Sequence, residues 1–268
     1  MTCLKSNAPA ASEIDIPALR AKYAYERDKR MRSETGEQYA SPEDNFVYDT
    51  REHDPFTPIQ PRDAIDEDLD VAIPGGGWTG ILAGFHLKNA GVTNFRHIEH
   101  AGGFGGTWYW NRYPGIQCDN DAYCYLPLLE EMGTLPSKKF ADGLEIYEYI
   151  QTIVDKYGFR ENALLHTEII GLEWQEDIKR WLVTTNRGDT IRARNVIMCG
   201  GTLSTPKFPG LPGLHAFKGK MFHTSRWDYD YSGGSWENPV LENLRDKRVA
   251  ILGTGATSIQ AVPYLGEF

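Results

Sequence analysis

The sequence predicts an α/β fold, with a parallel sheet flanked by helices, an antiparallel insertion and a second strand–helix unit behind it. Two segments carry the prediction, residues 68–100 and 247–265, because each runs from an apolar strand through a glycine turn into a helix. Between them, residues 164–199 have the pattern of short antiparallel strands, with turns at QEDIK and NRGD. This order is typical of a Rossmann-like protein that holds two dinucleotides.

The first unit is expected to place a strand at Asp70–Pro74, a helix at Trp78–Asn89 and a second strand at Phe95–Glu99. Apolar residues recur along the helix and allow it to pack on the sheet, and Gly91 ends it. Pro74 has no N–H to donate to a strand ladder, which is acceptable at the end of a strand.

The glycine turn of this unit has the spacing GxGxxG, at Gly75, Gly77 and Gly80. The first glycine allows the tight turn, the second lets the backbone approach a pyrophosphate, and the third lets the helix pack close to the strand. The N–H groups at the start of the helix then face the phosphates. Glu99 ends the next strand, 19 residues after Gly80, where a carboxylate binds ribose hydroxyls. An acid there favours an unphosphorylated ribose, as in FAD or NAD.

Other elements follow from the same reasoning. We expect a surface helix at Ile16–Arg32, a helix at about Gly143–Tyr157 and a strand at Asn195–Cys199. A further strand, Arg248–Leu252, should lead into the second glycine turn. The polar, proline-rich residues 1–66 are expected to wrap the surface of a domain.

The composition limits the classes of partner. The chain has 268 residues, of which 41% are hydrophobic, and a net charge of −9. Such an acidic chain is a poor ligand for nucleic acid or an anionic membrane. No apolar run approaches the ~20 residues of a spanning helix, and no apolar signal core opens the chain. The 4 cysteines and 7 histidines lack metal-ligand spacing, so we expect a soluble, cytoplasmic protein without a metal.

The stretch GGFGGTWYWNRYPGIQCD, residues 102–119, has neither helical nor strand periodicity. Two glycines at 105–106 allow the backbone to pass close to a ligand. Trp108 and Trp110 offer flat apolar walls for a ring system, and the rigid turn at 113–115 delivers Asp119 to its neighbourhood. The alternative interpretation is two core tryptophans and a turn acid.

This stretch resembles the flavin-binding signature of Baeyer–Villiger monooxygenases, which are FAD- and NADPH-dependent. Its positions are filled by Gly105, Gly106, Trp108, Tyr113, Pro114, Gly115 and Asp119. A second stretch, FKGKMFHTSRWD, is similar to the family's fingerprint, at Phe217, Gly219, His223 and Trp227. The resemblance covers residues 66–268. It implies an FAD-binding domain over 67–240, with the fingerprint linker at 217–228, and the start of a truncated NADP-binding domain over 241–268.

The resemblance also assigns site residues. Those expected to bind FAD are Gly75, Gly77, Gly80, Glu99, Gly106, Thr107, Trp108, Tyr109, Trp110, Asp119, Asn120 and Tyr125. Those expected to bind NADP are Gln117, Cys118, Asp119, Gly253, Thr254, Gly255, Ala256, Thr257, Ser258 and Ile259. Many members carry a basic residue where this chain has Gln117, so its grip on NADPH is expected to be weaker. NADP rather than NAD rests on the resemblance alone.

The implied reaction inserts one oxygen atom of O2 into a small-molecule ketone to give an ester or lactone, in specialised metabolism. Asp119 is the expected acid beside the flavin. His223 is expected to act as a hinge that couples domain movement to the reaction rather than as a base. The family's buried catalytic arginine is expected to be absent from this chain. The alternatives are therefore an inactive FAD-binding remnant and an N- or S-oxidising relative. The sequence does not indicate an oligomeric state.

Overall fold

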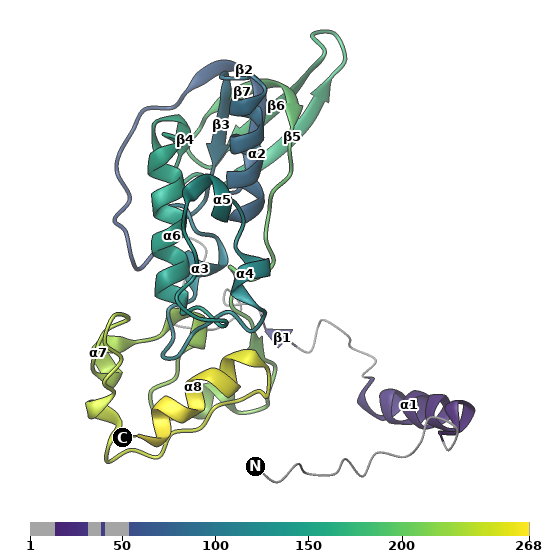
Figure 1. Cartoon of the computed structure of the whole chain (residues 1–268), viewed down its shortest axis with the longest axis vertical. Coiled ribbons are helices and arrows are strands. Elements are labelled where there is room, and N and C mark those ends of the chain that lie inside the picture. The colour runs from purple at the N-terminus through teal and green to yellow at the C-terminus, as the bar shows by residue number, and fades with distance from the viewer. Residues whose placement is uncertain (1–13, 32–38, 41–53, 268) are drawn as a thin grey trace.

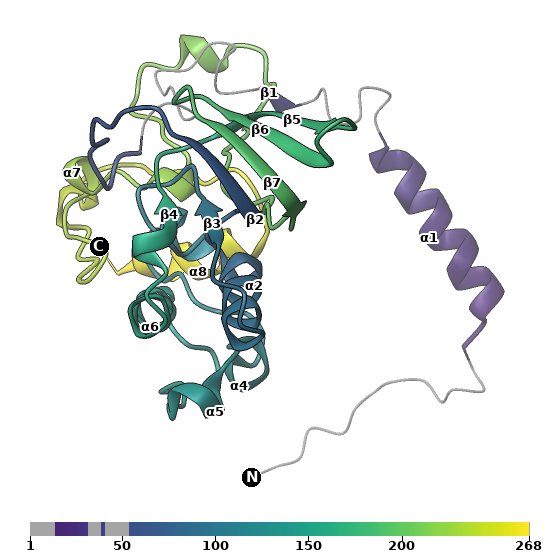
Figure 2. The same cartoon turned by 90° about the horizontal axis from the view of Figure 1, so that it is seen from above.

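The computed structural model describes residues 14–31, 39–40 and 54–267. Figure 1 shows one main body, with a twisted sheet at its upper end and the yellow helix α8 at its lower end. The helix α1 stands apart from this body in both views (Figures 1 and 2). No helix among the described residues is long and apolar enough to cross a membrane.

The main sheet has six strands in the order β4-β3-β2-β7-β6-β5. Strands β4, β3, β2 and β7 run parallel to one another, while β5 and β6 pair antiparallel beside β7. The strands are β2 (Asp66–Pro74), β3 (Phe95–Ile98), β4 (Ala163–Leu164), β5 (Ile169–Gln175), β6 (Arg180–Thr185) and β7 (Thr190–Val196). The predicted α/β fold with an antiparallel insertion is therefore confirmed.

Among the described α-helices, α1, α2, α6 and α8 are the long ones, and the others are single turns. The α-helices are α1 (Ile16–Arg30), α2 (Trp78–Asn89), α3 (Thr107–Trp110), α4 (Ala122–Tyr125), α5 (Leu129–Met132), α6 (Gly143–Lys156), α7 (Tyr229–Ser232) and α8 (Ala256–Gly266). The 3-10 turns are η4 (Arg160–Asn162), η5 (Leu214–Ala216), η6 (Thr224–Arg226) and η7 (Glu242–Leu244). A two-residue pair, β1 (Tyr39–Ala40) with β8 (Phe208–Pro209), completes the structure.

The core lies on both faces of the sheet. One cluster joins Val71 and Ile73 of β2 to the buried faces of α2 and α6, which lie on the same side of the sheet in Figure 2. The other cluster joins Leu69 of β2 to Val183 of β6 and Ile191 of β7. Burial of β2 on both faces explains its continuous apolar run and its central position.

The lead before the first strand contacts the body through polar side chains. Arg62 donates two hydrogen bonds to the buried carboxylate of Asp189, which lies in the turn between β6 and β7. Burial alone would raise the pKa of Asp189, but Arg62, Thr185 and the N–H of Ile65 lower it to about 2. Arg62 thus fastens the end of the lead to the body, whereas α1 has no buried residue, and the wrapping of the lead as a whole stays a prediction.

Several predicted boundaries are close to the observed ones, and one element is wrong. The helix Trp78–Asn89 is confirmed to the residue, and β7 ends at Val196 rather than at Cys199. The strand predicted at Arg248–Leu252 does not form, because no described segment pairs with it. Its apolar side chains are exposed, 48% for Val249 and 67% for Leu252. A strand needs neighbours for its backbone N–H and C=O groups, so a single apolar run does not make one.

Candidate dinucleotide site

The glycine turn after β2 forms a cradle that side chains would fill. Gly75 has a φ of +118°, which favours glycine. A Cβ on Gly80 would lie 2.0 Å from the carbonyl oxygen of Gly75, so the first turn of α2 packs directly on the loop. Helix α2 begins after Gly77 without a side-chain cap, which leaves N–H groups at its start for a ligand.

Glu99 lies beside this cradle at the carboxyl end of β3. Its carboxylate accepts hydrogen bonds from the N–H of Gly76 and, at 2.8 Å, from the N–H of Ala101. The residue is only 6% exposed. Each carboxylate oxygen has a second lone pair, so the predicted contact to a ribose hydroxyl is compatible with these bonds.

The second glycine stretch closes against the first. The N–H of Gly105 donates to the carbonyl of Gly76 at 2.9 Å, and a Cβ on Gly106 would lie 2.9 Å from the Cα of Gly77. Gly105 and Gly106 have φ values of +142° and +53°. Two loops that are 30 residues apart in sequence thus meet backbone to backbone, and α3 begins at that point.

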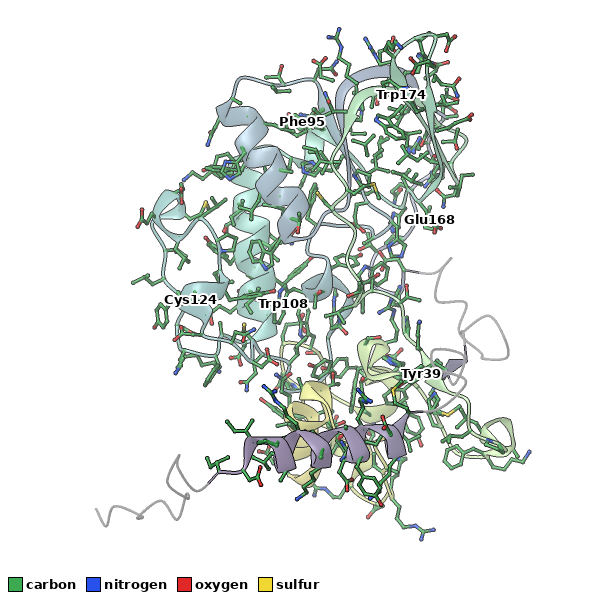
Figure 3. All side chains as sticks on the ribbon, turned by 90° about the vertical axis from the view of Figure 1, so that its right-hand side faces the viewer. Tyr39, Phe95, Trp108, Cys124, Glu168 and Trp174 are labelled. Carbon is green, nitrogen blue, oxygen red and sulfur yellow. The ribbon has the colours of Figure 1, made fainter. Side chains whose placement is uncertain are left out.

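The short helix α3 points its aromatic side chains in different directions. Trp108 donates from Nε1 to the hydroxyl of Tyr125 at 2.8 Å, and Figure 3 labels it between the sheet and α8. Tyr109 instead points toward the segment that precedes β2. Its hydroxyl donates to the buried carboxylate of Asp54 and lies 2.8 Å from the hydroxyl of Thr57. Tyr109, expected to bind FAD, lines neither cavity described below.

A cavity of about 370 Å³, called the flavin cavity here, lies between the two glycine loops. Its volume falls within the range of small-molecule sites. Its lining residues are Pro74, Gly75, Gly77, Trp78, Thr79, Ile98, Glu99, His100, Gly105, Gly106, Thr107, Trp108, Trp110, Tyr125, Thr167, Glu168, Ile169, Cys199, Gly200, Gly201, Leu203 and Ser204. Most of the residues expected to bind FAD therefore converge on one cavity.

A second cavity of about 470 Å³, called the nicotinamide cavity here, adjoins the first. Both are lined by Thr107, Trp108, Tyr125 and Leu203. Its other lining residues are Asn111, Tyr113, Ile116, Gln117, Cys118, Asp119, Asn120, Thr202, Thr205, His223, Thr224, Ser225, Ala256, Thr257 and Gln260. Residues from the flavin signature, the fingerprint and the second glycine unit are thus brought together.

Asp119 and its neighbours lie on the open side of the nicotinamide cavity. Asp119 and Asn120 are exposed, whereas Cys118 is buried and its thiol pKa is raised by that burial. Trp108 forms the wall between Asp119 and the flavin cavity. This position is compatible with the predicted role of Asp119 as an acid beside the flavin.

His223 is largely enclosed at the start of the turn η6. Its Nδ1 accepts from the N–H of Ser225 at 3.1 Å. Burial and the nearby charge of Arg226 lower the pKa of His223 to about 4, so its ring is neutral at pH 7. Through this bond the ring fixes the first turn of η6, and the hinge role of His223 stays a prediction.

The second glycine turn repeats the first in part. Gly253 has a φ of +123°, and α8 begins after Gly255 without a side-chain cap. The hydroxyl of Ser258 donates to the carbonyl of Gly253 at 2.9 Å. Of the NADP residues expected in this second unit, Ala256 and Thr257 line the nicotinamide cavity, whereas Gly253, Thr254, Gly255, Ser258 and Ile259 are not among its lining residues.

Gln260 of α8 joins the second unit to the flavin signature, and sequence reasoning missed it. Its Oε1 accepts from the hydroxyl of Tyr113 at 2.7 Å, and its Nε2 donates to the carbonyl of Gln117 at 2.9 Å. Gly115 packs so closely on α8 that a Cβ there would lie 2.5 Å from the carbonyl oxygen of Gln260. A polar residue inside the apolar run IQAV was the available signal.

Replacing Gln260→Leu should lower stability by about 2 kcal/mol, because the Tyr113 hydroxyl loses its acceptor on Gln260 and the Gln117 carbonyl loses its side-chain donor. Thermal denaturation measures the change. The control is Val262→Ala on the same helix, where the side chain is 51% exposed and the expected change is under ~0.5 kcal/mol. Equal melting temperatures for Gln260→Leu and the unmodified protein would show that the hydrogen bonds of Gln260 do not stabilise the contact between α8 and the flavin signature.

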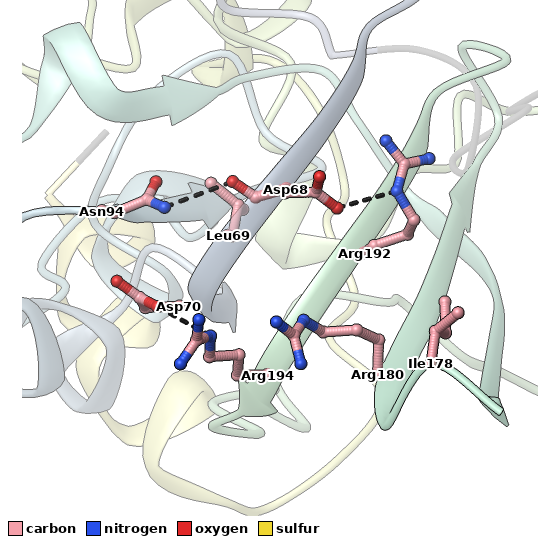
Figure 4. A pocket seen from close by; sticks show the side chains of 8 residues that line it. All are labelled: Asp68, Leu69, Asp70, Asn94, Ile178, Arg180, Arg192 and Arg194. Atoms are coloured by element: carbon pink, nitrogen blue, oxygen red, sulfur yellow. Dashed lines mark hydrogen bonds and ion pairs between the residues drawn. The ribbon is translucent and has the colours of Figure 1, made fainter. Parts of the chain in front are cut away.

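A third hollow, of about 480 Å³, is not a suitable dinucleotide site (Figure 4). Its place along the strand and its already paired charged side chains both exclude it. It lies beside the first residues of β2, at the opposite end of the strand from the glycine loop. Arg192 pairs with Asp66 and Asp68, and Arg194 pairs with Asp70, so most of its charge is already balanced. Ligands of open α/β sheets bind at the carboxyl ends of the strands. The described residues also contain no cluster suited to a metal ion.

Comparison with known proteins agrees with this geometry. The family described as flavin-binding monooxygenase-like matches residues 121–263. The chain is 48% identical over 255 residues to neopentalenolactone D synthase of Streptomyces avermitilis, covering 95% of this chain and 42% of that protein. It is 45% identical over 255 residues to Baeyer–Villiger monooxygenase 4 of Dietzia sp., covering 95% of this chain and 41% of that protein.

Solved structures show the same similarity. A polycyclic ketone monooxygenase from the fungus Thermothelomyces thermophila superimposes with a TM-score of 0.84 at 34% identity, over 94% of this chain and 43% of that one. OTEMO in complex with FAD and NADP superimposes with a TM-score of 0.65 at 32% identity, over 74% of this chain and 37% of that one. The chain thus spans about two fifths of the length of the relatives it matches. It belongs to the flavin-binding monooxygenase-like family, and the Baeyer–Villiger resemblance of its two signatures is confirmed.

Proposed function

We propose that the protein binds FAD and NADPH and takes part in the insertion of one oxygen atom of O2 into a ketone, giving an ester or lactone. The observation that carries the proposal is the wall shared by the flavin and nicotinamide cavities. Oxidoreductases of this kind must hold two dinucleotides with their reactive rings adjacent. Here one pair of side chains, Trp108 and Tyr125, faces both cavities.

The residues present fit FAD. At Gly75 and Gly80 an added Cβ would collide with backbone oxygens, so the glycine turn stays narrow, and the uncapped start of α2 offers N–H donors to the oxygens of a pyrophosphate. Glu99 lines the flavin cavity beside this turn, which supports the proposed contact to a ribose. When bound and reduced by NADPH, FAD supplies the oxygen-activating chemistry. The chain's own residues bind and orient it.

The NADP side is proposed on the same basis. OTEMO binds FAD and NADP, and the nicotinamide cavity brings Gln117, Asp119 and Thr257 together beside the shared wall. Asp119 would place a negative charge near the cofactor rings, and neutral His223 would hold the fingerprint while the two units move. The domain limits 1–66, 67–240 and 241–268 are part of this proposal.

The names of the relatives support a ketone substrate and specialised metabolism. One is a lactone D synthase and another a polycyclic ketone monooxygenase. We further propose a cytoplasmic protein with no nucleic acid or membrane partner, which agrees with the net charge of −9.

Ketone-dependent oxidation of NADPH tests the proposal. The purified protein, reconstituted with FAD, is incubated under air with NADPH and a cyclic or polycyclic ketone, and the product is analysed by mass spectrometry. We expect a lactone one oxygen atom heavier than the ketone, carrying ¹⁸O when ¹⁸O2 is supplied. Flavin that binds without product formation would instead favour an FAD-binding chain that is not catalytic. A parallel incubation with an amine or a sulfide in place of the ketone tests the N- or S-oxidising alternative, which an oxidised amine or sulfide would favour.

A further inference from the structure

Arg226 of the fingerprint is a buried cation. The residue is only 8% exposed. Its two terminal nitrogens donate to backbone carbonyls, at 3.3 Å to Trp110, at 3.0 Å to Ser225 and at 2.8 Å to Ser204. One of them also lies 3.5 Å from the Ser225 hydroxyl. These oxygens fix the guanidinium in one position but carry no net charge.

No anion of the described chain pairs with this guanidinium. All its hydrogen-bond acceptors within the described residues are carbonyl or hydroxyl oxygens, and its Nε is buried without a partner. Burial lowers the pKa of Arg226 to about 10, and the more distant Asp54 and Tyr109 offset only part of this effect. The side chain is still charged at pH 7. Buried charges are normally paired, so this one points to an anion that the polypeptide does not supply.

Asp54, a carboxylate whose charge acts on Arg226, does not pair with it directly. Asp54 accepts hydrogen bonds from the N–H groups of Phe56, Thr57 and Gly102 and from the hydroxyl of Tyr109, and it lies 3.2 Å from Nε2 of His166. Its negative charge raises the pKa of Arg226, but burial outweighs this effect. The hydrogen-bond acceptors of the guanidinium among the described residues are all uncharged oxygens.

The position of the charge identifies the occupant. The guanidinium carbon lies 4.3 Å from the ring centroid of Trp110, and both Trp110 and Ser204 line the flavin cavity. Ser225, the third partner, lines the nicotinamide cavity. The charge thus lies directly behind the wall of the flavin cavity, in a region of low dielectric where it acts strongly over several ångströms.

We propose that Arg226 is the fixed counter-charge of the anionic FAD bound in the flavin cavity. It acts through the wall formed by Trp110 and Ser204, so it is a positioning and electrostatic residue rather than a catalytic one. The inference rests on the proposed function, because it requires FAD in that cavity. The negative charge it balances lies either on the pyrophosphate, in every redox state, or on the flavin ring after reduction.

The test compares Arg226→Gln with Arg226→Lys. Gln is neutral but keeps N–H donors for the carbonyls, whereas Lys keeps the charge. If the partner is the pyrophosphate, FAD titration of the apoprotein, followed by fluorescence, should give a dissociation constant raised about tenfold for Arg226→Gln and at most about threefold for Arg226→Lys. If the partner is the reduced ring, Arg226→Gln should leave the affinity for oxidised FAD unchanged and lower the reduction potential of the bound flavin. Exposed Arg245→Gln removes the same charge and should change nothing. Circular dichroism and thermal melting of each apoprotein establish folding, and Arg226→Met is the second neutral variant if Gln fails to fold.

The reduction potential of the bound flavin separates the two sources of negative charge. Weaker binding of oxidised FAD with an unchanged potential assigns the partner as the pyrophosphate. Unchanged binding with a lowered potential assigns it as the reduced ring. Equal loss in the folded Gln and Lys variants, or no change in either affinity or potential, would overturn the inference in favour of a purely structural arginine. Wild-type protein that binds no FAD would instead refute the proposed function.

Discussion

Gly80→Ala should abolish FAD binding and lower the free energy of unfolding by about 3 kcal/mol. The added Cβ would lie 2.0 Å from the carbonyl oxygen of Gly75, well inside van der Waals contact. That oxygen belongs to a rigid turn whose Gly75 already has a φ of +118°, so the turn cannot yield without opening the cradle. Helix α2 must therefore tilt away, and its N–H donors leave the pyrophosphate position. FAD titration and chemical denaturation measure the two effects.

The control for this substitution is Gly266→Ala at the end of α8. Nothing lies within 4 Å of the Cβ it would add, and alanine favours helix over glycine. It should leave FAD affinity unchanged and stability equal or slightly raised. A Gly80→Ala protein that binds FAD with normal affinity would show that the glycine turn is not the cradle.

Asp54→Ala should destabilise the protein by about 3 kcal/mol at pH 7, because it removes the acceptor of three backbone N–H groups and of a buried hydroxyl at once. The carboxylate ties the chain before β2 to Gly102 and Tyr109, at the back of α3. Its loss should therefore loosen Trp108 as well and weaken FAD binding. Tyr109→Phe removes only the hydroxyl, with its bonds to Asp54 and Thr57, keeps the N–H bonds of the carboxylate, and should cost about 1 kcal/mol.

The same carboxylate gives the effect a defined pH dependence. Burial alone would raise the pKa of Asp54, but hydrogen bonds from Tyr109, Phe56 and Gly102 outweigh it and lower the pKa below 3.8. A lowered folded-state pKa contributes stability above pH ~4, and that stability is lost as the pH falls further. The gap in stability between the unmodified protein and Asp54→Asn should therefore narrow below pH ~4. Exposed Asp28→Asn should show no such gap. A gap that stayed constant down to pH 2 would contradict the assignment.

Local signals in the sequence predicted the first unit well. The helix Trp78–Asn89 was found to the residue because a glycine turn precedes it and Gly91 follows it. The glycine spacing and the acid 19 residues later placed Glu99 beside the cradle, as the structure has it. Such features depend on neighbours within one strand–helix unit, and local sequence encodes them.

Features that depend on distant partners could not be predicted. The strand expected at Arg248–Leu252 pairs with no strand among the described residues, so its apolar pattern alone was not a sufficient signal. Asp54 accepts a hydrogen bond from Gly102, which is 48 residues away in sequence. Gln260 donates one to Gln117, which is 143 residues away. Tyr109 was grouped with its aromatic neighbours, but a helical turn rotates successive side chains by about 100° and directs it to Asp54.

The visible absorption spectrum of the purified protein, after reconstitution with FAD and removal of free cofactor, tests the central claim most directly. One FAD per chain is predicted, with a flavin band shifted from that of free FAD by the apolar walls at Trp108 and Trp110. The Gly80→Ala protein should show no such band. A colourless wild-type protein that melts cooperatively and gains no stability from added FAD would contradict the account.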